Sequence, residues 1–342
     1  MRTRTLGKTG IVVSELAFGG LFTSSLGPGF EESRAAVHKA LELGINYFDT
    51  APAYANSEEI LGKILWGVKT PTVLSTKLGG RPQPFEPRNT KQLLDSVQES
   101  LRLLHREVID ILFVHEPDRP QQYDWWSDPE AVYGPVIEVL DQLKSQGVIR
   151  YTGLGGTTMA EMTHLMRSNR FDVVLTAFNY SALFREATHE VLPAAKERDM
   201  GVVLGSVLQQ GGLGRRYDDV VRAKPAWLSK ARQQQFLAFY KLLDDSGLSI
   251  VELCLRFAIA CPDAHAILIG PKTAQQVADS VRAIDKGPLP QDVARRLDEI
   301  AALVPFRPFE EPMILPLNRP RAYYGPGSAN IGAGANVGKL PP

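Results

Sequence analysis

Four polar residues, Asp49, Tyr54, Lys77 and His115, stand at or just beyond the carboxyl ends of three apolar runs that predict β-strands. Reduction of a carbonyl group by hydride transfer needs a group that protonates the developing alkoxide, and the reverse oxidation needs a base. A tyrosine can do both if a nearby ammonium favours its phenolate, because the ordinary phenol pKa of about 10 is too high for neutral pH. We therefore assign Tyr54 as the general acid and base, Lys77 as the ammonium, Asp49 as its counter-ion and His115 as the group that orients the substrate oxygen.

A single lysine or aspartate at the end of a strand is usually a solvated or capping residue. The catalytic interpretation therefore depends on whether the fold brings the four residues together. Eight short apolar runs rich in β-branched and aromatic residues alternate with segments of helical periodicity. Such alternation is typical of βαβ units around a parallel sheet, and eight units predict an α/β fold, a (β/α)8 TIM barrel whose strands end at one mouth.

The expected strands are 16–19, 45–49, 72–77, 108–114, 150–154, 172–176, 201–206 and 266–270. The expected helices are 31–43, 57–66, 90–104, 133–146, 159–168, 187–199, 231–260 with an interruption near Gly247, 273–284 and, after the barrel, 290–302.

Residues 1–305 are expected to form the barrel domain, and residues 306–342, which are rich in proline and glycine, are expected to be a loop or tail. The segment around Gly7 to Gly10 predicts an N-terminal β-hairpin that caps the amino-terminal mouth of the barrel. Two long loops, 117–134 and 209–229, follow the fourth and seventh strands. Both lie at the carboxyl-terminal face, where barrel enzymes place their sites.

The composition excludes several classes of protein. Thirty-eight basic and 38 acidic residues leave no net charge, which disfavours nucleic acid and anionic membranes as partners. The first residues lack the apolar region of a secretory signal and no run is long enough to span a bilayer, so we expect a cytoplasmic protein. Cys254 and Cys261 are expected to be reduced core residues, and the scattered histidines predict no metal site. The oligomeric state is left open.

Four segments, 44–65, 73–79, 99–118 and 149–156, resemble in order the signature segments of aldo-keto reductases. The family's Asp, Tyr, Lys and His fall on Asp49, Tyr54, Lys77 and His115. The resemblance implies a nicotinamide hydride carrier that is bound without a Rossmann domain. In agreement, no G-x-G-x-x-G follows a predicted strand and opens a helix.

The resemblance also implies cofactor contacts in the segments after the seventh and eighth strands, with a helix N-terminus that favours phosphate. For the segment 270–280, an ordinary helix start is the competing interpretation. The implied cofactor positions are Gly20, Asp49, Gly155, Asn179, Ser206, Leu208, Gly211, Gly270, Lys272, Thr273 and Gln276.

The sequence departs from the commonest pattern of the family at Gly155-Gly156, where many members carry Ser-Asn, and at Ala177 and Gly205. A branch that includes L-galactose, L-fucose and D-threo-aldose dehydrogenases is similar at these places. Gly270 and Gln276 stand where a Lys and Arg pair commonly grips the 2′-phosphate of NADP. Without two fixed cations such a phosphate gains less, so we expect NAD, and Lys272 keeps NADP possible.

The substrate is expected to be a small carbonyl compound or sugar. Trp125 and Trp126, in the loop over the predicted mouth, could stack on a sugar face or close an apolar pocket, and plain loop packing is an equal alternative. The first hypothesis is oxidation of a sugar lactol at its anomeric carbon, with the hydride passing to NAD and the proton to Tyr54. The second is NADPH-dependent reduction of aldehydes or ketones. The third is a cofactor-binding, redox-sensing regulatory subunit, as some members of the family are.

Overall fold

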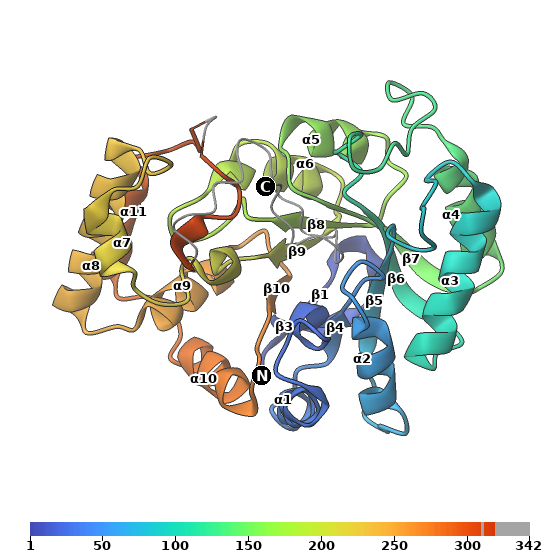
Figure 1. The fold of residues 1–342 in the computed structure, drawn as a ribbon, viewed down its shortest axis with the longest axis horizontal. Coiled ribbons are helices and arrows are strands. Elements are labelled where there is room, and N and C mark those ends of the chain that lie inside the picture. The colour runs from blue at the N-terminus through green and yellow to red at the C-terminus, as the bar shows by residue number, and fades with distance from the viewer. Residues whose placement is uncertain (309–310, 319–342) are drawn as a thin grey trace, which may run out of the picture.

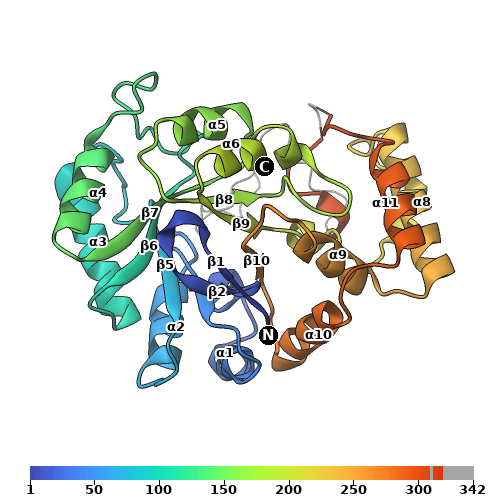
Figure 2. The same cartoon turned by 180° about the vertical axis from the view of Figure 1, so that it is seen from behind.

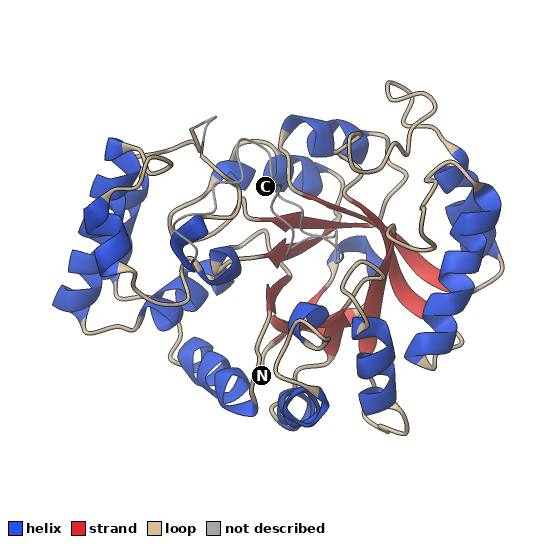
Figure 3. Cartoon of the chain, in the orientation of Figure 1, coloured by secondary structure: helices blue, strands red, loops and turns tan. Residues whose placement is uncertain are grey.

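The computed structural model describes residues 1–308 and 311–318, and their centre is a closed barrel of eight parallel strands. Around the barrel the strands follow the order β10-β3-β4-β5-β6-β7-β8-β9, so that each strand pairs with its neighbour in sequence and the last closes on the first. Helices surround them (Figures 1 and 3). This is the predicted (β/α)8 architecture. The barrel strands are β3 (Leu16–Gly19), β4 (Tyr47–Asp49), β5 (Val73–Leu78), β6 (Ile109–His115), β7 (Ile149–Gly156), β8 (Val173–Ala177), β9 (Gly201–Gly205) and β10 (Ala266–Ile269).

Most of the predicted helices form, because each has an apolar face that packs on the strands or on a neighbouring helix, and several begin at a residue whose side chain caps the helix. Asn89, for example, accepts a hydrogen bond from the Gln92 amide at 3.2 Å at the start of α3. The helices are α1 (Phe30–Glu42), α2 (Ser57–Leu65), α3 (Thr90–Leu104), α4 (Pro135–Ser145), α5 (Ala160–Arg167), α6 (Val191–Glu197), α7 (Asp218–Ala223), α8 (Lys230–Ser246), α9 (Ile250–Ile259), α10 (Ala274–Asp285) and α11 (Gln291–Ala301).

One predicted helix, 187–199, is wrong over its first part. The structure has a 3-10 turn at Glu186–Thr188, and α6 begins only at Val191. Pro193 explains the late start, because proline cannot donate a backbone hydrogen bond and fits a helix only in its first turn. The predicted loop 209–229 also contains an element that was not expected, the short helix α7.

The interruption predicted near Gly247 separates two helices with different roles. Gly247 ends α8 in the left-handed region at φ 67°, and Ser249 then accepts from the Glu252 amide to begin α9. Helix α9 packs on the barrel, whereas α8 leaves it and packs against α7 and α11. These three helices form a separate layer beside the barrel (Figure 1), with its own apolar cluster.

The predicted N-terminal hairpin forms from the antiparallel strands β1 (Thr3–Thr5) and β2 (Val12–Ser14). It lies across the amino-terminal end of the barrel (Figure 2). Its turn is held there by the Lys8 amide, which donates to the Asp199 carbonyl at 2.7 Å, and by the buried side chain of Leu6, which packs on Gly201. The hairpin and the inward-facing apolar residues fill this end of the barrel, so a site inside the barrel can open only at the carboxyl-terminal end.

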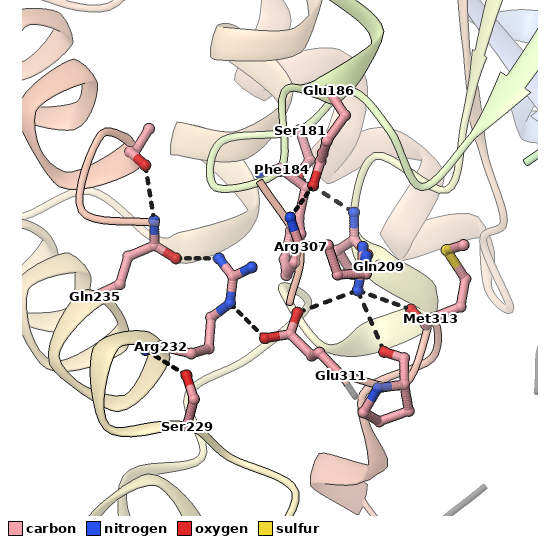
Figure 4. A network of polar contacts seen from close by, with 12 residues as sticks. Ser181, Phe184, Glu186, Gln209, Ser229, Arg232, Gln235, Arg307, Glu311 and Met313 are labelled. Carbon is pink, nitrogen blue, oxygen red and sulfur yellow. Dashed lines mark hydrogen bonds and ion pairs between the residues drawn. The ribbon is translucent and has the colours of Figure 1, made fainter. Parts of the chain in front are cut away.

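A buried polar network fastens the segment after α11 to α8 and to the 3-10 turn that follows β8 (Figure 4). Arg232 on α8 and Glu311 form an ion pair at 2.8 Å, with side chains that are 0% and 2% exposed. Arg307 bonds to the same carboxylate at 3.3 Å, and its amide donates to Glu186 at 2.9 Å. The predicted tail therefore begins with an anchored segment that includes the short turn Pro316–Asn318. The rest of the predicted 306–342 extension lies outside the described residues.

Candidate active site

The centre of the site is an ion pair at the carboxyl ends of two neighbouring strands. Lys77 on β5 donates to Asp49 Oδ2, at the end of β4, at 2.6 Å and to the Thr50 carbonyl at 2.7 Å. Ser75 donates to the other oxygen of Asp49 at 2.6 Å. The side chains of Lys77 and Asp49 are only 2% and 3% exposed. Since both charges are buried and two short hydrogen bonds hold Lys77 Nζ, the position of the ammonium is fixed.

Tyr54 and His115 complete the cluster predicted from the sequence. Tyr54 lies in the turn between β4 and α2, and the Lys77 ammonium is 4.9 Å from the centre of its ring. His115 ends β6, and its ring meets that of Tyr54 edge-on with 5.8 Å between the centroids. The structure therefore brings together the phenol, the ammonium, the carboxylate and the imidazole from three neighbouring strands and the turn after one of them.

The ionisation of Tyr54 differs from the sequence-based expectation that Lys77 favours a phenolate. Burial raises the pKa of Tyr54 well above its ordinary value, and the charges of Asp49 and Glu116 raise it further. Burial also lowers the pKa of Lys77, although Asp49 opposes this shift. Tyr54 is thus a protonated phenol at neutral pH, which is the form that donates a proton to an alkoxide.

His115 is a neutral imidazole, because burial lowers its pKa well below the ordinary value and the charge of Lys77 lowers it further. Its Nδ1 is buried without a hydrogen-bond partner among the described residues. A neutral ring carries one N–H, which can donate to a substrate oxygen. This arrangement is compatible with the orienting role that the sequence predicts for His115.

A cavity of about 810 Å³ extends from these four residues to the segments after β9 and β10. Its size is that of a site for a large organic ligand. Glycines line much of it and let a ligand approach the backbone closely, so the cavity fits a nicotinamide dinucleotide. The predicted cofactor positions that line it are Asp49, Gly155, Ser206, Leu208, Gly211, Gly270, Lys272 and Gln276.

Three predicted cofactor positions are outside this lining, and each has a structural contact. The Gly20 carbonyl accepts from Ser57 at 2.7 Å. The Asn179 amide nitrogen donates to the Thr157 carbonyl at 2.7 Å. Thr273 accepts from the backbone amide of Gln276 and so caps α10. The contact of Thr273 is therefore that of an ordinary helix start, which was the alternative to a cofactor contact.

Gly156, one of the departures from the common family pattern, has a packing reason. A Cβ atom at this position would lie 2.5 Å from Asp118 Oδ1 and would also collide with the Met162 sulfur. Asp118 cannot move away easily, because its other oxygen accepts from the amides of Thr157 and Thr158 at 2.8 and 2.6 Å. The acid in the β6 loop thus requires glycine at the end of β7.

The two tryptophans predicted over the mouth are packed inside their loop. Trp125 is 0% and Trp126 7% exposed, and their indole nitrogens donate to the carbonyls of His115 and Pro117 at 3.0 and 2.8 Å. Neither lines the cavity. The stacking role proposed for them from the sequence is therefore wrong for this structure, because the rings hold the loop after β6 instead of facing a ligand.

Among the cavity residues that the sequence argument missed, two make contacts that bear on a ligand. Phe22 follows β3, and the Lys272 ammonium lies 4.4 Å from its ring centre. Glu116 directly follows His115, and burial, together with Asp118, raises its pKa to about 8. Its position in the sequence could have identified Glu116, because it is an acidic residue that directly follows the catalytic candidate His115 at the end of a strand.

The described residues contain no group of three or more His, Cys, Asp or Glu side chains placed to hold a metal ion. Within the same part of the chain, no helix has the length and apolar character needed to cross a membrane.

The barrel and its site define an aldo-keto reductase, and the sequence comparison shows the same: residues 15–302 match the model of the aldo/keto reductase family. The chain belongs to this family and is an oxidoreductase. Members use a nicotinamide dinucleotide, NAD(P)H, as the hydride carrier.

Among the curated relatives, L-galactose dehydrogenase of Arabidopsis thaliana is 28% identical over 82% of this chain and 87% of its own length. D-threo-aldose 1-dehydrogenase of a Pseudomonas species is 27% identical over 59% of this chain and 68% of its own. A probable voltage-gated potassium channel subunit beta of Oryza sativa is 24% identical over 90% of this chain and 98% of its own.

Among solved structures, the holo form of aldo-keto reductase AKR11C1 from Bacillus halodurans is similar, with a TM-score of 0.69. It is 26% identical in sequence, and the similarity covers 89% of this chain and 97% of that one.

Proposed function

We propose that the protein oxidises an aldose, as its cyclic lactol, at C1 and passes the hydride to NAD, with Tyr54 as the general acid and base. The observation that carries this proposal is the buried Lys77–Asp49 ion pair beside the Tyr54 ring, at one end of a cavity of about 810 Å³. The names of two relatives, L-galactose dehydrogenase and D-threo-aldose 1-dehydrogenase, support an aldose as the substrate and C1 as the site.

Within this function, His115 would donate a hydrogen bond to the anomeric oxygen and hold the substrate carbon over the hydride carrier. Oxidised nicotinamide, when bound, would supply the hydride acceptor. The Lys77 ammonium, 4.9 Å from the centre of the Tyr54 ring, is the fixed positive charge that favours loss of the phenol proton against the effect of burial. Lys77, fixed by Asp49, would stabilise the phenolate formed during the reaction.

The choice of NAD rests on charges at the far end of the cavity. Arg282 pairs with Asp279 at 3.0 Å, and Lys286 pairs with Glu252 at 2.7 Å. All four residues line the cavity. Their cations are already neutralised by carboxylates that would repel a 2′-phosphate, whereas a ribose hydroxyl can donate to a carboxylate. Lys272, over the Phe22 ring, is the residue that would support NADP.

The experiment that tests the catalytic assignment is Tyr54→Phe, measured as nicotinamide absorbance with NAD and a panel of aldoses. The phenyl ring keeps the packing but removes the proton carrier, so kcat should fall by about 10²- to 10⁴-fold. Dissociation constants for NAD, from fluorescence titration, should stay within about threefold. Tyr133→Phe, which removes a hydroxyl from an exposed loop residue, is the matched control. Unchanged turnover in Tyr54→Phe would disprove the assignment.

One observation favours the second candidate, NADPH-dependent reduction of aldehydes or ketones. The raised pKa of Tyr54 keeps the phenol protonated, and a reduction begins from that form. A paired assay, NAD with aldoses against NADPH with aldehydes, separates the two directions. Aldose oxidation with a lower KM for NAD than for NADP is the result expected from the proposed function.

A further inference from the structure

Glu116 directly follows His115, one of the four residues of the site, and lines the cavity. It follows the last residue of β6, and its backbone has φ of 48°, in the left-handed region. A glutamate there costs about 1–3 kcal/mol, which is stored only where the surrounding structure fixes it, commonly at functional sites. The Glu116 amide is fixed by donation to the Gly155 carbonyl at 2.8 Å.

The carboxylate of Glu116 is held from one side only. Arg119 Nε is 3.1 Å from Oε2, and the Thr157 hydroxyl is 3.4 Å from the same atom. Arg119 and Thr157 are themselves joined by a hydrogen bond of 2.6 Å. Among the described residues, no donor is hydrogen-bonded to Oε1. The side chain is therefore oriented by the loop after β6 and the end of β7, and one of its oxygens is left to accept from a ligand.

Above its own pKa of about 8, the ionised Glu116 carboxylate acts on the reacting end of the cavity. Its charge raises the pKa of Tyr54, after larger contributions from burial and Asp49, and also raises that of Lys77, after Asp49 and Glu58. Glu116 therefore belongs to the end where hydride and proton are exchanged, and not to the end formed by α10.

A purely structural role would be to anchor the loop through Arg119. That role explains Oε2 but gives no reason for a strained residue to face the cavity while its second oxygen is left without a donor. Oε1 is not one of the enclosed side-chain atoms that lack a partner, and Glu116 lines the cavity, so a ligand hydroxyl can reach this oxygen.

We propose that Glu116 is a specificity-determining residue, which accepts a hydrogen bond from a substrate hydroxyl on the carbon next to the reacting one and so selects hydroxylated carbonyl compounds over simple aldehydes. The inference rests on the proposed function for its substrate class. A substrate without that hydroxyl excludes water from Oε1 and gives it no donor in return, and it therefore reacts more slowly.

The test compares reduction of glyceraldehyde with reduction of propanal, a pair of three-carbon aldehydes with and without hydroxyl groups. Both are assayed at about pH 9, because Glu116, with a pKa of about 8, is then ionised. In Glu116→Gln the amide oxygen has to keep the contacts with Arg119 and Thr157, so the NH₂ group replaces the acceptor at the cavity. The ratio of kcat/KM for glyceraldehyde to that for propanal should fall by about 10-fold or more. The value of kcat/KM for propanal is the reference, because it reports any effect of the lost charge on Tyr54 alone.

Two further variants separate substrate contact from other effects. Glu130→Gln removes an exposed carboxylate from the same loop and should leave the ratio unchanged. Thr157→Val loosens the anchor of Glu116 but keeps its carboxylate, so it should retain most of the preference for glyceraldehyde.

Equal losses for both aldehydes in Glu116→Gln, an unchanged ratio, or no preference in the wild-type protein would each overturn the inference. A fall of the ratio in Thr157→Val as large as in Glu116→Gln would assign the effect to loop anchoring and also overturn it. Absence of aldose oxidation by the wild-type protein would refute the proposed direction alone, because the ratio is measured by reduction.

Discussion

The buried ion pair between Lys77 and Asp49 allows stability and catalysis to be separated in one mutant cycle. The two charges are 2.6 Å apart and almost fully buried. Coulomb's law gives an attraction of about 6 kcal/mol at an effective dielectric constant of about 20, most of which offsets the cost of removing both charges from water. Breaking the pair is expensive for a different reason, since it leaves the other charge buried and unpaired.

Lys77→Met and Asp49→Asn should each lower the free energy of unfolding by about 3–5 kcal/mol. The double variant, in which neither charge is left without a partner, should lie within about 1–2 kcal/mol of the wild-type protein. The measurement is urea unfolding followed by circular dichroism at neutral pH. The exposed pair Lys91–Asp95 on α3, joined at the same 2.6 Å, is the matched control, and its cycle should couple by less than about 0.5 kcal/mol.

The turnover of the variants should not follow their stability, because the reaction needs the Lys77 ammonium beside the Tyr54 phenol even in a stably folded protein. All three variants should lose turnover, and the double variant should regain stability without regaining activity. If the double variant is as unstable as Lys77→Met, the stability argument is wrong. If it recovers turnover, the ammonium has no part in the reaction.

Three further predictions concern other positions. Gly156→Ala should lower the free energy of unfolding by about 1–3 kcal/mol, because the added Cβ would lie 2.5 Å from a carboxylate oxygen. Gly155→Ala is the control, because its Cβ would meet nothing nearer than 3.8 Å, and urea unfolding should show little change in its stability. Arg232→Met should cost about 3–5 kcal/mol in urea unfolding, because it leaves the buried Glu311 with only the longer contact of 3.3 Å to Arg307. Burial raises the pKa of Glu116 from 4.5 to about 8, so the folded protein retains a proton that the unfolded chain releases, and stability falls as pH rises across that window. Glu116→Gln should remove this slope, worth at most about 5 kcal/mol, when unfolding is compared at about pH 5 and pH 9.

The barrel was predictable because its signals are local. Each of the eight strands is a short apolar run, and each helix carries its periodicity and caps within ten to twenty residues. The N-terminal hairpin and the break at Gly247 followed from glycines that adopt positive φ. Where a local signal was misjudged, as at Pro193, the helix began later than expected. The convergence of Tyr54 with its partners followed from strand order alone, since parallel strands in a closed barrel end at one mouth.

What the sequence determined by itself was therefore the order of the elements and the chemical types of residue at the strand ends. Tertiary structure decided how those residues ionise and which of them face the cavity. Burial keeps Tyr54 protonated and His115 neutral, a loop packs Trp125 inward, and Asp118 fills the space beside Gly156. The physical reason is that desolvation and steric fit depend on atoms from elements far apart in the chain, and these meet only when the barrel closes.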